Sequence, residues 1–142
     1  MTKISIDDAD FPLVVVKFPA GFAERELDEL YEKLFAYGRQ GFGYVQLLDM
    51  MESDPMQMPA TLRAHAAKLE ATYIARYSAT VAAEAYVVES ALTRGMLTAF
   101  HWLRGAAPWP VKFFSDGDAA RAWLLEHATK AGLCRVAKAA GG

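Results

Sequence analysis

Few residues of this chain have the types and spacing that catalysis or metal binding requires. The three histidines, His65, His101 and His127, are far apart, and no two are four positions apart. No helix can therefore present a pair of imidazole ligands to a metal ion. His101 lies among aromatic and aliphatic neighbours, and we expect it to pack rather than to bind a metal.

The one cysteine and the one acidic cluster are equally weak candidates. Cys134 has no adjacent base in the sequence, and a single cysteine forms neither an internal disulfide nor a cysteine-based zinc site. Asp49, Glu52 and Asp54 follow a predicted strand, where ligands of parallel sheets tend to bind. Their loop lacks the glycine and the regular alternation of a calcium loop, so we expect a solvated turn.

Motifs for nucleotide binding and for serine hydrolysis are absent. The sequence contains no G-x-G-x-x-G, no P-loop and no G-x-S-x-G. We therefore expect no cofactor and no enzymatic activity. The chain has 15 basic and 17 acidic residues, a net charge of −2. This balance gives no support to a nucleic-acid partner or to an anionic membrane surface.

A methionine-rich loop is the most suggestive feature. "MMESDPMQM" contains four of the six methionines, and methionine is favoured on adaptable binding surfaces. Alternatively, two of the four fill the core, because alternate residues near a strand end face opposite ways. We predict a binding surface made by this loop, Met50 to Pro59, and the start of the next helix. Its predicted contact residues are Met51, Ser53, Asp54, Met56 and Thr61.

Trp109 is a further predicted binding residue. It lies between two prolines in "AAPWP". A tryptophan in such a loop is either an exposed anchor for a partner or a lid over the edge of the sheet.

The elements that position these residues alternate along the chain in the order β-β-α-β-α-β-α-β-α. Strands are expected in "KISID", "FPLVVVKF", "FGYVQLLDM", "ATVAAEAYVVES" and "PVKFF". Helices are expected over 23–41, 60–77, from Ser90 to about Gly105, and over 116–132. Strands that alternate with helices favour a mostly parallel sheet covered by helices, to which the N-terminal hairpin adds an antiparallel edge.

Caps and apolar periodicity predict the ends and buried sides of the helices. Ser90 is expected to cap the third helix, and Ser115 or Asp116 the last. The buried side of the third helix is expected to include Leu92 and Leu103, and that of the last helix Ala119, Ala122 and Trp123. Glu70 of the second helix is assigned to the solvent side with Arg63, Lys68 and Arg76.

Two stretches resemble a known family. "AYVVESALTRGMLTAFHWL", followed by "PWPVKFFSDGDAARAWL", is similar to the SpoIIAA-like, or STAS/SEC14-type, bacterial proteins. The closing pattern F-x-D-x-x-x-A-x-x-W-L corresponds here to Phe114, Asp116, Ala120, Trp123 and Leu124. "YVQLLDM" resembles the family's central strand, which also ends in an aspartate. The likeness covers about residues 10 to 126, and its motifs are mainly packing and capping signatures.

The resemblance implies an α/β fold: a single mixed, mostly parallel sheet of four to five strands with about four helices. A length of 142 residues fits one domain over 1–142, with a short flexible tail from about residue 132. In anti-sigma-factor antagonists of this fold, a serine of an Asp-Ser pair at a helix start is phosphorylated. Here Ser53 precedes Asp54, and Thr61 is the only hydroxyl near the helix start, so that switch is not carried over.

The resemblance also implies a non-catalytic regulatory or protein-binding module. The alternative, from the SEC14 side, is a carrier of a small apolar ligand or lipid. A carrier needs an enclosed apolar pocket of several hundred Å³, whereas a protein-binding module needs an exposed patch. The N-terminus lacks the apolar run of a signal peptide, and no segment approaches the length of a membrane helix, so we expect a cytoplasmic protein without membrane insertion.

A protein partner, which includes a second copy of the chain, is expected from the third helix. Met96, Leu97, Phe100, Trp102 and Leu103 spread apolar character around more than one side of it. A helix that is apolar all round is normally buried on all sides. We therefore expect a homodimer or a stable hetero-complex that covers this helix near Leu97 and Trp102.

Overall fold

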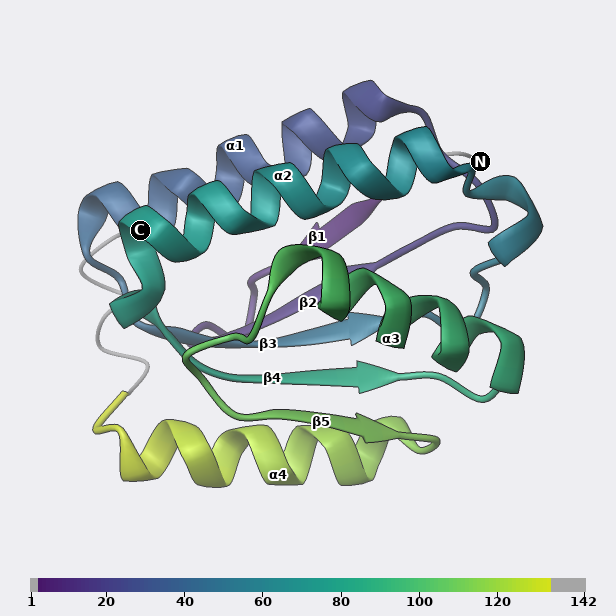
Figure 1. The fold of residues 1–142 in the computed structure, drawn as a ribbon. Helices are drawn as coiled ribbons and strands as arrows, with labels where there is room; N and C mark the ends of the chain where they lie inside the picture. The colour runs from purple at the N-terminus through teal and green to yellow at the C-terminus, as the bar shows by residue number, and fades with distance from the viewer. Residues whose placement is uncertain (1–2, 134–142) are drawn as a thin grey trace.

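The computed structural model describes residues 3–133, which form one five-stranded sheet with helices on both of its faces (Figure 1). The strands are β1 (Ser5–Asp7), β2 (Leu13–Lys17), β3 (Tyr44–Asp49), β4 (Val81–Val87) and β5 (Val111–Phe114). They lie side by side in chain order; β1 is antiparallel to β2, and the other neighbours are parallel. The predicted element order and mixed sheet are confirmed. Cys134 and nearly all of the predicted tail lie outside the described residues.

The helices divide unequally between the two faces. Three helices, α1 (Glu24–Gln40), α2 (Ala60–Tyr77) and α3 (Ala91–Arg104), cover one face, and α4 (Gly117–Lys130) covers the other (Figure 1). Short 3-10 turns, η1 (Pro55–Gln57) and η2 (Ser78–Thr80), flank α2. We call the two sides the three-helix face and the α4 face.

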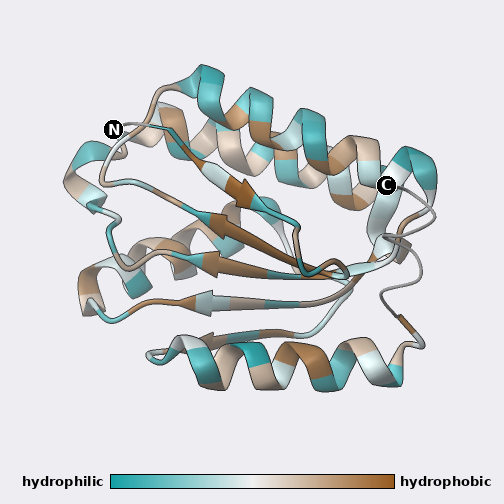
Figure 2. Cartoon of the chain, turned by 180° about the vertical axis from the view of Figure 1, so that it is seen from behind, coloured by the Kyte–Doolittle hydropathy of each residue, from teal (hydrophilic) through white to brown (hydrophobic). Residues whose placement is uncertain are grey.

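The strands in the middle of the sheet are buried on both sides because each face is covered by helices. Successive side chains of a strand point to opposite faces. In β3, Tyr44 and Leu48 join the core of the three-helix face, whereas Val45 and Leu47 join that of the α4 face. Seen from behind, the middle strands are largely hydrophobic, and the helices carry hydrophilic residues on their outer sides (Figure 2).

Local signals in the sequence set the ends of the helices as predicted. The Ser90 hydroxyl accepts a hydrogen bond from the Thr93 backbone N–H at 3.2 Å and caps α3. At the start of α4 it is Asp116, not Ser115, that accepts from the next amides. Gly41 follows α1 with φ of 71°, a left-handed conformation that glycine adopts without a steric penalty.

The predicted buried sides of α3 and α4 are wrong in part. In α3, Leu92 and Leu103 are exposed, and the buried residues are Thr93, Leu97 and Arg104. Two of these three are polar, so hydrophobicity alone indicated the wrong side of the helix.

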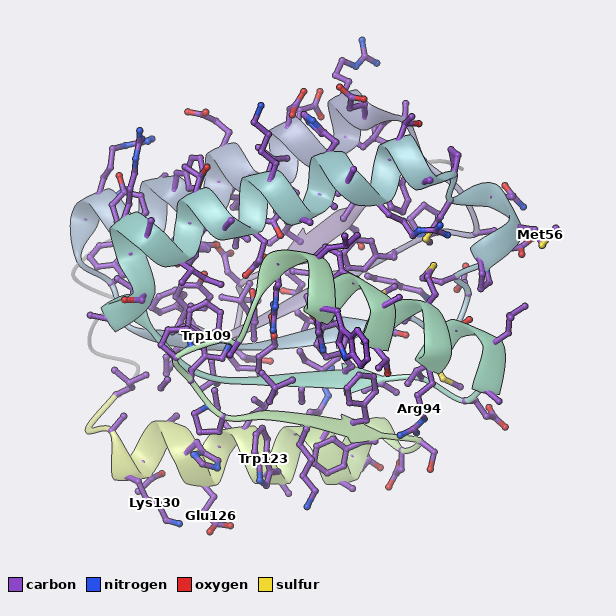
Figure 3. The ribbon with its side chains drawn as sticks, viewed as in Figure 1. Met56, Arg94, Trp109, Trp123, Glu126 and Lys130 are labelled. Carbon is purple, nitrogen blue, oxygen red and sulfur yellow. The ribbon has the colours of Figure 1, made fainter. Side chains whose placement is uncertain are left out.

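In α4 the buried residues are Ala120, Leu124 and Ala128, whereas the predicted Ala119 and Ala122 are exposed. Alanines occur all around this helix, so their positions did not distinguish its two sides. Trp123 is half-buried beside the Phe114 ring, with the centroids 5.7 Å apart. Glu126 and Lys130 form an exposed ion pair on the outer side (Figure 3).

Candidate functional site

A pocket lies between the sheet and the three helices α1, α2 and α3. Its volume is about 80 Å³, and most of its lining is apolar, with walls from all three helices and from β2, β3 and β4. The lining residues of α2 and α3 include four that are only half-buried, so the pocket reaches the surface between these two helices. They are Arg63, Ala66, Met96 and Phe100.

Buried polar groups form the inner end of this pocket. Gln46 and Glu70 are among its lining residues. The Gln46 Nε2 donates to Glu84 Oε2 at 2.6 Å, and the Tyr31 hydroxyl donates to Glu70 Oε2. Arg104 joins the two carboxylates, with Nη2 3.4 Å from Glu84 Oε1 and Nη1 3.6 Å from Glu70 Oε1. We call Gln46, Glu70, Glu84 and Arg104, with Tyr31, the buried polar cluster.

Glu70 is therefore not on the solvent side of α2, and this corrects the prediction. Glu70 lies one helical turn beyond Ala66 and one turn before Tyr73, both of which pack against the core. Its charge suggested a solvated position, but the sequence does not show that Arg104 of α3 and Tyr31 of α1 meet it there.

Burial and the nearby Glu84 carboxylate, against the opposing effects of Tyr31 and Arg104, together raise the pKa of Glu70 to about 7. For Arg104, burial opposes the charged form, but the two carboxylates, Glu84 first, raise its pKa overall. When both carboxyl groups are ionised, two negative charges share one guanidinium. The cluster then carries one uncompensated negative charge in the protein interior.

His101 is a packing residue, as predicted. Its Nε2 lies 3.0 Å from the Tyr86 hydroxyl, and its ring meets those of Tyr86 and Phe113 edge-on. Burial, together with the charge of Arg104, lowers the pKa of His101 to about 4. The imidazole is therefore neutral at physiological pH.

The other two histidines contact different parts of the fold. His65 of α2 lies 2.7 Å from Asp28 of α1 through its Nε2, and His127 packs against the Trp123 ring. Within residues 3–133 no group of three histidine, cysteine or acidic side chains is arranged to hold a metal ion.

The methionine loop places two of its four methionines in the core and two on the surface. Met50 and Met58 are buried in the core and line the pocket. Met56 is 84% exposed at the carboxyl end of the strands, and Met51 is also exposed (Figure 3). Met50 and Met51 at the end of β3 face opposite ways, as alternation predicts, whereas the turn η1 separates the exposed Met56 from the buried Met58.

The polar residues predicted in this loop mostly stabilise its own backbone. The Asp54 carboxylate accepts from the Met56 N–H at 3.0 Å and caps the turn η1. Ser53 is half-buried, with its hydroxyl 3.7 Å from the sulfur of Met50, and Thr61 is exposed in the first turn of α2. The three acidic residues also make local contacts. Asp49 accepts from the Met51 N–H, and Glu52 lies 2.9 Å from the Lys17 ammonium.

Trp109 does not belong to the surface of the methionine loop. It is 5% exposed and packs edge-on against Tyr73, with the centroids 6.4 Å apart. Figure 3 shows Trp109 and Met56 at opposite ends of the sheet. The exposed-anchor interpretation is therefore wrong, and Trp109 covers the core before β5, as in the lid alternative.

The outer side of α3 is apolar but has no covering element within the described chain. Trp102 is 84% exposed, and Leu92 and Leu103 are also exposed. Leu97, which was expected at the same interface as Trp102, is instead part of the core.

Sequence reasoning did not identify the buried polar cluster, although one signal was available. Gln46 and Glu84 interrupt the apolar runs "YVQLLD" and "VAAEAYV", and they are register partners on neighbouring strands. Strands buried on both faces are nearly continuous apolar runs. A polar residue in the middle of two such runs indicates a buried interaction, which the sequence alone could have suggested.

Comparison with known proteins supports the fold. No protein-family model matches the sequence, and no curated protein matches it. The structure is similar to the crystal structure of an uncharacterized protein of the DUF3478 family, with a SpoIIAA-like fold, from Shewanella loihica PV-4. The TM-score is 0.61 at 18% identity, and the match covers 85% of this chain and 91% of that one.

The chain therefore has a SpoIIAA-like fold, which confirms the resemblance found in its motifs. A fold of this kind hosts different functions, so the function has to be argued from the site. None of the helices within residues 3–133 is both long enough and apolar enough to cross a bilayer.

Proposed function

We propose that the protein is a non-catalytic binding module whose ligand site is the pocket between α1, α2, α3 and the sheet. One observation carries this proposal: a largely apolar pocket ends at two buried polar side chains, Gln46 and Glu70. Sites for small molecules typically combine apolar walls with a few polar groups that orient the ligand. Glu70, with its raised pKa, adds the perturbed titration that is common at functional sites.

The size of the pocket limits what it can hold. A volume of about 80 Å³ is well below the several hundred Å³ that a carrier of a whole lipid needs. An apolar cavity of about 150 Å³ holds benzene, so this pocket is smaller than a benzene site. The pocket therefore fits the end of a chain whose remainder extends between α2 and α3.

The surroundings of Glu70 support binding without turnover. A carboxyl group with a pKa near 7 is suited to general acid–base catalysis. However, Tyr31 and Arg104 already contact its two oxygens. The described residues that line the pocket include no serine, threonine, cysteine or histidine to act as a nucleophile or second base.

A series of straight-chain alcohols from 1-butanol to 1-octanol tests the proposal, with binding measured by NMR titration. We expect saturable binding that strengthens with chain length. Ala66→Leu narrows the pocket from α2 and should abolish it. Ala64→Leu is the matched control, because Ala64 is exposed on the same helix and does not line the pocket. Equal binding by both variants would contradict the proposal.

A second candidate function, protein binding through the methionine loop, is supported by exposed apolar side chains. Met51 and Met56 are exposed, and the turn η1 that holds Met56 contacts α3, which begins near the exposed Leu92. Exposed apolar groups that gather on a soluble domain favour a protein contact. For a second copy of this chain as the partner, light scattering should show a dimer at micromolar concentration that Met56→Glu dissociates. A monomeric parent protein would contradict self-association.

A further inference from the structure

The hydrogen bonds of Gln46 determine which of its amide atoms is free. Its Nε2 donates to Glu84 at 2.6 Å, and this assignment agrees with a carboxylate that can only accept. The Oε1 of Gln46 is buried and has no hydrogen-bond partner within residues 3–133. Because Gln46 is 3% exposed and lines the pocket, its unpartnered atom is an acceptor at the inner end of the site.

The charges beside Gln46 also favour a hydrogen-bond donor in the pocket. Glu70 lines the pocket, whereas Arg104, which partly neutralises it, is not among the lining residues. The Arg104 guanidinium lies over the Phe100 ring, 5.7 Å from its centroid, and its side chain is buried. With Glu70 and Glu84 both ionised, the pocket therefore ends at acceptors and an incompletely compensated negative charge.

We propose that the pocket selects a ligand whose buried end donates hydrogen bonds, a primary ammonium group on an apolar chain, and that it rejects a carboxylate at that position. The inference rests on the proposed function, because it names the chemical class of the ligand for the same site. An ammonium group has three donors and no acceptor. Two of them match Gln46 Oε1 and the Glu70 carboxylate, while the chain contacts the apolar walls.

A reversed mode of binding has to be distinguished from this one. Arg63 is half-buried at the opening of the pocket, and its Nη1 donates to the Met58 carbonyl at 3.1 Å. An amphiphilic acid could place its carboxylate at Arg63 and its chain inside the pocket. The acceptor of Gln46 would then stay unpartnered beneath an apolar chain, which is unfavourable.

Three probes of equal chain length separate these modes: hexylammonium, 1-hexanol and hexanoate. Binding to the full chain is measured by NMR titration at about pH 8, where an alkylamine is still protonated. Charge-assisted hydrogen bonds predict that hexylammonium binds about tenfold or more tightly than hexanoate. Glu70→Gln should reduce hexylammonium binding to the level of 1-hexanol and leave 1-hexanol nearly unchanged.

Gln46→Met provides a second variant that keeps the volume of the side chain but removes the acceptor. It should weaken hexylammonium binding several-fold. Hexanoate binding that equals or exceeds hexylammonium binding, and that Arg63→Gln abolishes, would overturn the inference but leave the pocket as the ligand site. Binding of 1-hexanol without any preference for hexylammonium would also overturn it. If none of the three probes binds, the proposed function fails, and the inference fails with it.

Discussion

The two faces of the sheet differ in what they bury. On the α4 face the buried side chains are all apolar and several are alanines, such as Ala83 and Ala85 beneath Ala120 and Ala128. All the buried polar and charged residues of the described chain lie on the three-helix face. They are Gln46, Glu70, Glu84, Thr93 and Arg104.

This difference is the one expected if the α4 face is purely structural and the three-helix face holds the proposed ligand site. Small apolar residues let α4 approach the sheet closely, and no polar group there needs a partner. On the other face, two carboxylates and a guanidinium are removed from water, which costs stability unless their contacts compensate. Local choices that disfavour stability are expected where a protein has a functional site. Four predictions test this contrast.

The largest effect should come from the buried polar cluster. Arg104→Leu leaves Glu70 and Glu84 buried without a cation and should cost about 3–5 kcal/mol of unfolding free energy. Urea denaturation at about pH 8 measures this loss, which should be smaller at about pH 5 because Glu70 is then protonated. Arg121→Leu, at an exposed position of α4, is the control. A similar small loss for both variants would show that the cluster does not depend on Arg104.

A purely apolar loss is predicted for the α4 face. Leu124 is fully buried, and Leu124→Ala should cost about 3 kcal/mol through lost contacts and a cavity. Its neighbour Leu125 is about half exposed, and Leu125→Ala should cost well under half as much. Alcohol binding should be unchanged in both folded variants. Loss of binding in Leu124→Ala would mean that the two faces are not independent.

The pH dependence of stability should be specific to the three-helix face. The pKa of Glu70 is raised to about 7 in the folded state. Its contribution to the free energy of unfolding is therefore fully present below about pH 4.5 and is lost as pH rises through 7. The pKa of His101 is lowered to about 4, so its contribution is present above about pH 6.5 and is lost as pH falls through 4. The two contributions oppose each other between about pH 4.5 and 6.5.

Single variants should separate the two opposing contributions to the pH dependence of stability. Thermal melting of the parent should vary little across this window. Glu70→Gln should melt at higher temperature as pH rises, and His101→Phe at lower temperature. Between about pH 4.5 and 8, the contribution of Glu70 to the free energy of unfolding should change by about 3 kcal/mol. Parallel profiles for the parent and Glu70→Gln would show that Glu70 has an ordinary pKa.

The smallest effect is expected on the outer side of α3. Trp102 is 84% exposed, so Trp102→Glu should change the stability of a monomer by no more than about 0.5 kcal/mol. Thermal melting at several protein concentrations measures this. A larger loss that depends on protein concentration would show that a second copy of the chain covers Trp102.

The sequence predicted the fold better than the site, for a physical reason. Ser90 and Asp116 act on amides within three residues, so their caps can be read locally. The burial of Glu70 depends instead on Tyr31, 39 positions earlier, and on Arg104 of another helix. Such pairs are determined by tertiary packing, and helix periodicity does not show them.

Methionine methyl groups test the central claim most directly, because this chain has reporters both inside and outside the pocket. Met50, Met58 and Met96 line it, whereas Met51 and Met56 are exposed on the loop. In methyl NMR spectra of protein labelled at methionine, hexylammonium should shift the signals of the three pocket methionines and leave those of Met51 and Met56 in place. Shifts of Met51 and Met56 alone, with the pocket signals unchanged, would contradict the account.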